Sequence, residues 1–140
     1  MSEFSLIYVS HGLLSENEAQ AAIKDIIAAS LVRNARENIT GALLYTGANF
    51  VQILEGPEAA VGRLMDGIKR DPRHDQVEVL ETMTSVPRLF EGWSMAYIGD
   101  SLYVRRHVEA LLTEPQGSHG LVAAIRRMRH IMRELVHTLH

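Results

Sequence analysis

The sequence predicts an α+β fold, a ferredoxin-like sandwich in which helices cover a mixed sheet of five strands. Apolar segments with period-two alternation are interspersed with segments of helical period, in the order strand–helix–strand–strand–helix–strand. A short turn separates the second strand from the third, which indicates a hairpin. The chain of 140 residues is 46% hydrophobic and 22% charged, as expected for one globular domain with a core.

The first strand is expected at residues 4–10. Its residues are apolar on both faces, so it should lie in the centre of the sheet and be covered on both sides. A helix should follow Ser15, because Ser15 and Glu18 have the spacing of a capping box. This helix should reach about Asn34. Its apolar residues at helical spacing are Ala22, Ile23, Ile26, Ile27 and Leu31.

Four further strands and a second helix are expected after the first helix. The strands are predicted at residues 39–45, 50–55, 77–84 and 93–98. The second helix should begin at Pro57, which suits a first helical turn, and reach about Arg70. In this arrangement we expect the first and third strands to be parallel neighbours and both helices to cover one face of the sheet.

Residues 101–140 are expected to form two helices joined by a linker at residues 114–118. The last helix has a heptad-like apolar pattern at Leu121, Ile125, Met128, Met132, Leu135 and Leu139. We expect it to cover the second face of the sheet, and a dimer interface is the alternative. The chain is therefore divided into a domain at residues 1–100 and a helical appendage at residues 101–140.

Composition and charge argue against several classes of protein. The net charge of −3 gives no global affinity for nucleic acid, and the absence of cysteine excludes disulfide scaffolds and thiol catalysis. No apolar segment approaches the roughly 18 residues of a membrane span. The N-terminus has no signal-like segment, so we expect a cytoplasmic protein. Because the common catalytic and metal-binding motifs are absent, we expect neither an enzyme nor a metal site.

A glutamine lies in the middle of an apolar strand. Gln52 shares one strand face with Phe50 and Leu54, and that face is expected to be buried. An unpaired buried amide costs roughly 1–3 kcal/mol, so a polar partner should lie beside it. Tyr8 on the first strand is expected to point to the same helix-covered face, which would bring its hydroxyl within reach of the amide.

Two further groups of polar residues each have a structural and a functional interpretation. One face of the first helix carries Ile26, Ser30, Arg33 and Asn34. Asn34 either caps the helix or binds a flat polar ligand between the two helices. The end of the second helix is followed by a basic cluster at residues 69–74 that includes Asp71, Arg73 and His74. This cluster is either a solvated helix end or a site for an anionic tail such as a phosphate.

Trp93 and Met95 are expected to share one face of the last strand. They either pack in the core or form a mobile lid beside a ligand.

In their order and spacing these segments resemble the BLUF domain, a flavin-binding blue-light sensor. The resemblance covers about residues 4–98 and rests on residues 6–10, 33–34, 39–41, 50–56, 70–74 and 93–95. The most distinctive segment is Phe-Val-Gln-Ile-Leu-Glu-Gly at residues 50–56. The resemblance is to the short, stand-alone type, so we expect no output domain after His140.

The resemblance implies a flavin between the two helices, with FAD expected and FMN or riboflavin as alternatives. The cofactor-binding residues that it implies are Tyr8, Ile26, Ser30, Arg33, Asn34, Gln52, Ile68, Asp71, Arg73 and His74. The photoactive residues that it implies are Tyr8, Gln52, Trp93 and Met95. Gly67 departs from the family, because relatives often have a larger polar side chain there, which leaves the choice among flavins open.

The mechanism that the resemblance implies is a photocycle without substrate turnover. Blue light excites the flavin, Tyr8 transiently donates an electron and then a proton, and Gln52 rearranges to bind flavin O4 more strongly. A red-shifted state results and decays in the dark. The signal is expected to pass through the last strand into residues 101–140, and from there to an unidentified effector protein or through a homo-oligomer.

Two alternatives to the light sensor follow from the same residues. The first is a light-insensitive module that binds a small ligand on a ferredoxin-like fold. The second is an acylphosphatase-like hydrolase that would use Arg33 and Asn34 to bind phosphate.

Overall fold

The computed structural model describes residues 3–139, without the side chain of Leu139, so the last position of the heptad-like pattern lies outside the described side chains. The elements are β1 (Glu3–Gly12), α1 (Glu16–Glu37), β2 (Thr40–Tyr45), β3 (Asn49–Gly56), α2 (Glu58–Lys69), β4 (His74–Val86), β5 (Ala96–Ile98), α3 (Leu102–Thr113) and α4 (His119–Leu139). The predicted α+β class is confirmed, and each expected helix and strand is present within a few residues of its predicted position.

The described residues form a five-stranded sheet in the order β4-β1-β3-β2-β5. It is mixed, because β5 runs parallel to β2 while the other neighbours are antiparallel. The prediction that β1 and β3 are parallel is wrong. The helix between β1 and β2 returns the chain to the same end of the sheet, so these two strands are parallel. The hairpin then reverses β3 against both of them.

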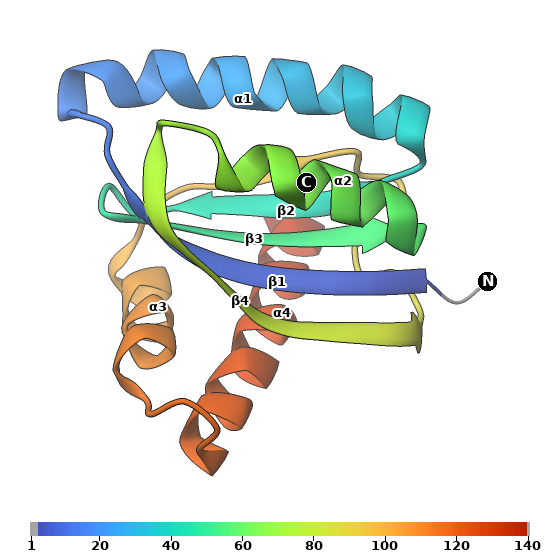
Figure 1. Cartoon of the computed structure of the whole chain (residues 1–140). Coiled ribbons are helices and arrows are strands. Elements are labelled where there is room, and N and C mark those ends of the chain that lie inside the picture. The colour runs from blue at the N-terminus through green and yellow to red at the C-terminus, as the bar shows by residue number, and fades with distance from the viewer. Residues whose placement is uncertain (1–2, 140) are drawn as a thin grey trace.

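Helices cover both faces of this sheet, and each face has its own core (Figure 1). In Figure 1, α1 and α2 lie above the sheet and α3 and α4 lie below it. Leu6 and Tyr8 of β1 belong to the core under α1 and α2, whereas Ile7 and Val9 belong to the core formed with α3 and α4. The predicted central position of β1, covered on both sides, is therefore confirmed.

The first helix begins as predicted and ends later. Ser15 and Glu18 form the capping box, with each side chain bonded to the backbone N–H of the other. The helix continues to Glu37 and is closed by Asn38 in a left-handed conformation, with φ 60°. Asn34 is therefore not the cap. Leu31 is 45% exposed, so it is an exception to the predicted apolar face.

The last strand is shorter than predicted. Pairing with β2 begins only at Ala96, and Gly92 turns the preceding backbone with φ 88°. Because residues 93–95 are not a strand, the alternation that was expected to place Trp93 and Met95 on one face does not apply. Met95 is buried in the core under α1 and α2, whereas Trp93 packs against the core on the other side of the sheet.

The C-terminal helices supply one side of the second core. Four of the predicted apolar positions of α4 are buried there, namely Leu121, Ile125, Met128 and Met132, and Leu135 is partly buried. The predicted cover for the second face of the sheet is therefore confirmed. Within residues 3–139, none of the helices is both long enough and apolar enough to cross a membrane.

Candidate functional site

A cavity of about 350 Å³ lies between α1, α2 and the upper face of the sheet. Its lining is apolar on most sides, with polar groups at one wall and around the opening. The lining residues are Tyr8, Ile26, Ala29, Ser30, Arg33, Glu37, Ile39, Leu43, Phe50, Gln52, Ala60, Arg63, Leu64, Gly67, Ile68, Asp71, Arg73 and His74. An apolar cavity of this size with a few convergent polar groups is the usual form of a small-molecule site.

The polar wall of the cavity is a hydrogen-bonded pair of buried side chains. Tyr8 and Gln52 lie opposite each other in the β1–β3 register, so both point to the α1–α2 side. The phenol of Tyr8 donates to Oε1 of Gln52 at 2.6 Å. Burial, and to a smaller extent the charge of Asp71, raises the pKa of Tyr8 well above its ordinary value. The phenol therefore keeps its proton and acts as the donor, and the expected polar partner of Gln52 is found.

The other end of the Gln52 amide contacts a sulfur atom. Nε2 of Gln52 lies 3.6 Å from Sδ of Met95, which comes directly after Ser94 in the segment before β5. A thioether is a weak acceptor. The amide is thus held firmly on its oxygen side by Tyr8 and loosely on its nitrogen side by Met95.

His74 closes the cavity beside the tyrosine. Its Nε2 lies 2.6 Å from the carbonyl oxygen of Ile68, and its Nδ1 lies 2.7 Å from Oγ of Ser10. Because a carbonyl oxygen only accepts, Nε2 carries a proton and donates. The ring also packs edge-on against Tyr8 and Phe50, with centroids 6.1 and 5.8 Å apart. His74 is therefore fixed in place by contacts on both nitrogens and on its ring.

Two of the three arginines that line the cavity form ion pairs within the protein. Arg73 forms a bidentate pair with Asp71, with nitrogen–oxygen distances of 2.5 and 2.9 Å. These hydrogen bonds are the main reason why the pKa of Asp71 is lowered. Arg63 pairs with Glu37 at 3.3 Å. Partial burial lowers the pKa of Arg33, whose guanidinium reaches Ser30 at 3.4 Å.

Asn34 lies behind the cavity wall and does not line the cavity. Its side chain is fully buried, and its Nδ2 donates to the backbone carbonyl of Ser94 at 2.8 Å. Its Oδ1 accepts from Nε of Arg33 at 3.4 Å. Asn34 therefore links α1 to the segment that carries Met95.

Most of the predicted site residues converge on the cavity. Nine of them line it: Tyr8, Ile26, Ser30, Arg33, Gln52, Ile68, Asp71, Arg73 and His74. Asn34, Trp93 and Met95 do not, although Met95 contacts Gln52 from behind. The binding and photochemical roles of these residues stay predictions.

The sequence interpretation missed several lining residues. Leu43 lies opposite Gln52 in the β2–β3 register, and Leu64 precedes Ile68 by one helical turn. Both could have been found by extending the same periodicity from the residues that were identified. Glu37 gave no comparable signal, because α1 was expected to end at Asn34, and Arg63 on α2 gave none either.

The residues of the cavity fit a flavin. The aliphatic side chains of Ile26 on α1 and Ile68 on α2 both line it and offer apolar surface to a flat aromatic ring system, and Gln52 on β3 adds an amide to the lining. The amide nitrogen of Gln52 indicates that a ligand binds here, because its one described contact is the thioether sulfur of Met95, which is a weak acceptor. A ring carbonyl or ring nitrogen of a flavin would satisfy it better.

Comparisons of this chain with a family model, with curated relatives and with solved structures all identify the same family. The family model BLUF, described as sensors of blue-light using FAD, matches residues 4–96. The blue light- and temperature-regulated antirepressor BluF of Escherichia coli (strain K12) is 39% identical over 70 residues, which is 50% of this chain and 17% of that protein. The beta subunit of the photoactivated adenylate cyclase of Euglena gracilis is 41% identical over 64 residues, 45% of this chain and 8% of that protein. The chain thus matches less than a fifth of the length of either relative.

Two solved structures resemble nearly the whole chain. The dark-state structure of the BLUF protein BlrB is 35% identical with a TM-score of 0.72, and the match covers 91% of this chain and 94% of that chain. The photo-activated state of BlsA has a TM-score of 0.78 at 22% identity and covers 94% of both chains, a likeness that shows the fold alone. Both comparisons extend beyond the family model into α3 and α4.

Proposed function

This chain belongs to the BLUF family of blue-light sensors that use FAD, and we propose that its light-driven step is carried by the contact between Tyr8 and Gln52. It is a flavin-binding photoreceptor. The proposal rests on one observation, the 2.6 Å hydrogen bond between these two buried side chains at the wall of the cavity. FAD is the flavin that the family uses, and binding of FMN or riboflavin by this chain is an open alternative.

Ile26 and Ile68 would hold the flavin ring between the helices, and Arg33, Arg73 and His74 would lie closest to its polar substituents. The bound flavin supplies absorption of blue light and an electron acceptor. Tyr8 is the donor in this proposal. Its phenol is protonated and has a single described hydrogen bond, so its electron and then its proton leave from a fixed position.

Gln52 is the moving part in this proposal. Rotation of its amide exchanges the oxygen and nitrogen atoms between Tyr8 and Met95 without changing the volume that the side chain fills. Tautomerisation would exchange donor and acceptor without rotation. In either case the hydrogen bond between Tyr8 and Gln52 is remade with donor and acceptor exchanged, which makes the site a two-state element that a photon can switch.

The signal then leaves the site on the side of Met95. From Met95 the chain continues into β5 and then into α3, whose N-cap is Ser101. In the relatives, a similar sensor segment belongs to an antirepressor or to an adenylate cyclase subunit. We infer that this chain likewise acts on an effector protein through α3 and α4. The identity of that effector, a homo-oligomer and a cytoplasmic location stay predictions.

A pair of tyrosine variants tests the proposal. Tyr8→Phe should still bind flavin but lose the reversible red shift of the flavin absorption under blue light. Tyr45→Phe is the matched control, because Tyr45 is buried under the same helices but donates to the carbonyl of Gly47 at 3.1 Å. A normal photocycle in Tyr8→Phe would contradict the proposal. An equal loss of the red shift in both variants would also contradict the proposal, because the effect would then not depend on the contact with Gln52.

The hydrolase alternative finds no support in the described site. An acylphosphatase would need Arg33 and Asn34 to reach a phosphate together. The amide of Asn34 is buried and donates to the backbone carbonyl of Ser94. A flavin-free, colourless protein that hydrolyses acyl phosphates would restore this alternative.

A further inference from the structure

A second buried polar side chain on β3 faces away from the flavin cavity. Glu55 is three residues beyond Gln52, so it points to the face of the sheet that α3 and α4 cover. It is 1% exposed. An ionised carboxylate at such a position requires strong partners, and each of its oxygens has them.

The partners of Glu55 are backbone N–H groups of the β4–β5 connection, defined as residues 87–95. Leu89 donates to Oε2 at 2.6 Å and Phe90 donates to Oε1 at 3.0 Å. The hydroxyl of Thr40 on β2 donates to Oε1 at 3.0 Å. Hydrogen bonds from backbone amides to a carboxylate are among the stronger ones in proteins. Glu55 therefore fixes the β4–β5 connection to the sheet at one place.

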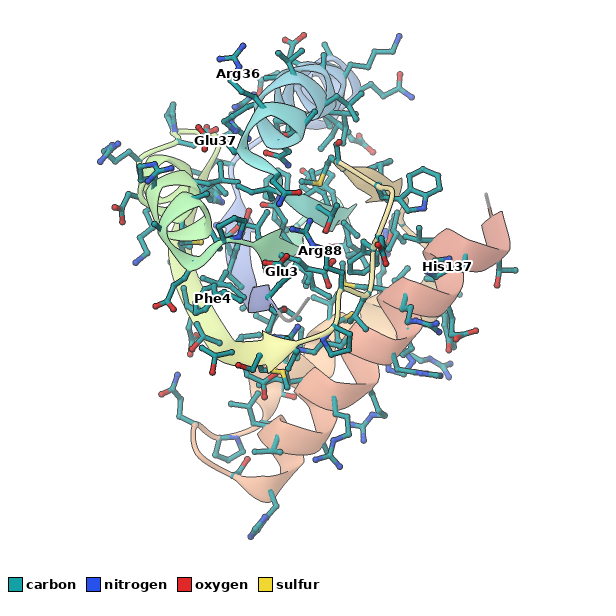
Figure 2. All side chains as sticks on the ribbon, turned by 90° about the vertical axis from the view of Figure 1, so that its right-hand side faces the viewer. Glu3, Phe4, Arg36, Glu37, Arg88 and His137 are labelled. Atoms are coloured by element: carbon teal, nitrogen blue, oxygen red, sulfur yellow. The ribbon has the colours of Figure 1, made fainter. Side chains whose placement is uncertain are left out.

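A basic side chain balances the charge of Glu55. Arg88 lies in the same connection and donates to the hydroxyl of Thr40 at 3.1 Å, next to the carboxylate. It also pairs with Glu3 at 3.1 Å, and Figure 2 shows these two side chains close together. Burial raises the pKa of Glu55, whereas the two backbone N–H groups, Thr40 and Arg88 act in the opposite direction.

The β4–β5 connection touches the photochemical site at its far end. The carbonyl of Trp93 accepts from the N–H of Gly41 at 3.0 Å, and the carbonyl of Ser94 accepts from Asn34 at 2.8 Å. The next residue, Met95, contacts the amide of Gln52. The position of Met95 is therefore set by a segment whose other end is bound by Glu55.

The same connection also contacts the C-terminal helix. Nε2 of His137 on α4 lies 3.1 Å from the carbonyl oxygen of Leu89, the residue whose N–H is bound by Glu55. Phe90 is fully buried in the core that α3 and α4 complete. Figure 2 places His137 on the helix that runs beside this connection. One short segment thus contacts both Gln52 and α4.

From this arrangement we propose that Glu55 is a positioning residue for the photocycle. By binding the N–H groups of Leu89 and Phe90, it fixes the connection that holds Met95 against Gln52 and links the site to α4. This inference rests on the proposed function. It assigns Glu55 no contact with the flavin, so removing the carboxylate should leave the red shift in place and alter the rate at which the red-shifted state decays.

The first test is the Glu55→Gln variant. A glutamine keeps the shape and one acceptor oxygen but turns an NH₂ group toward a backbone N–H. The red shift should be of normal size, the rate of dark recovery should change by about tenfold, and the amides of Leu89 and Phe90 should exchange about tenfold faster. Glu91→Gln is the matched control, because Glu91 is an exposed glutamate in the same connection. A folded Glu55→Gln protein with unchanged recovery kinetics overturns the proposal.

The second test needs no variant and applies if Glu55→Gln does not fold. Amide hydrogen exchange of the flavin-loaded, unmodified protein is measured in the dark and under blue light. The proposal requires the amides of Leu89 and Phe90 to be protected in the dark and to exchange faster in the light. Lack of protection, or protection that light leaves unchanged, overturns it. If the proposed photocycle itself is absent, the same sample shows no red shift, which distinguishes that failure from a failure of the inference about Glu55.

Discussion

The phenolic oxygen of Tyr8 lies 2.6 Å from the amide oxygen of Gln52, although 44 positions separate the two residues in the sequence. The antiparallel register of β1 and β3 brings them together, because it places their Cα atoms directly opposite each other. Both side chains are almost completely buried. The pair is thus a buried contact at the wall of the cavity.

Replacing Gln52 by leucine should abolish the red shift while flavin remains bound. Leucine fills a similar volume but has no amide to rearrange, and it leaves the hydroxyl of Tyr8 buried without its acceptor. We expect a loss of about 1–3 kcal/mol in the free energy of unfolding. Absorption spectra before and after blue light, together with denaturant unfolding, measure both effects. Gln20→Leu on the exposed face of α1 is the control and should change neither.

The raised pKa of Tyr8 predicts a loss of stability at alkaline pH. An unfolded tyrosine ionises near pH 10. Because the folded pKa is higher, the stability contributed by Tyr8 is complete below about pH 10 and is lost as the pH rises above it, by up to about 1.4 kcal/mol per pH unit. Denaturant unfolding at several alkaline pH values should show this slope in the unmodified protein and a smaller one in Tyr8→Phe. Equal slopes in both proteins would show that Tyr8 does not titrate in this way.

Substitutions at two glycines of α2 should distinguish an effect on helix stability from an effect on flavin binding. A Cβ atom at either Gly62 or Gly67 would meet nothing within 4 Å, but only Gly67 lines the cavity. Replacing either by alanine should raise the free energy of unfolding by roughly 0.5–1 kcal/mol. Replacing Gly67 by leucine should weaken flavin binding, whereas the same change at Gly62 should not. Titration with flavin measures the difference, and equal affinities would place the flavin elsewhere.

The pair of Asp71 and Arg73 predicts a small loss of stability in acid. The hydrogen bonds from Arg73 lower the pKa of Asp71, so the stability they give is present above the unfolded pKa of about 3.9 and is lost as the pH falls through the folded pKa. Both side chains are partly exposed, which limits the effect to about 1 kcal/mol. Asp71→Asn should therefore be less stable than the unmodified protein at about pH 6 and closer to it at about pH 2. If the difference in stability between Asp71→Asn and the unmodified protein became larger in acid, this assignment would be contradicted.

Side-chain periodicity, together with the expected adjacency of the first and third strands, predicted the centre of the site. In a strand, alternate residues share a face whether the neighbouring strand is parallel or antiparallel. The contact between Tyr8 and Gln52 was therefore predicted correctly even though the relative direction of β1 and β3 was not. The direction depends on how the chain returns through α1, which periodicity does not encode.

The surroundings of Gln52 outside the strands were harder to predict. Met95 and Trp93 point to opposite sides because the backbone before Ala96 is irregular. Asn34 binds a carbonyl of the same segment because α1 continues past it to a left-handed Asn38. The alternation rule does not extend to such segments, and the register of α1 against them is set by tertiary packing.

The absorption spectrum of the purified, flavin-loaded protein before and after blue light tests the central claim most directly. If light rewires the contact between Tyr8 and Gln52, the flavin bands shift slightly to the red and return fully in the dark. A flavin-loaded protein whose spectrum does not change on illumination, or changes only by irreversible bleaching, would contradict the account.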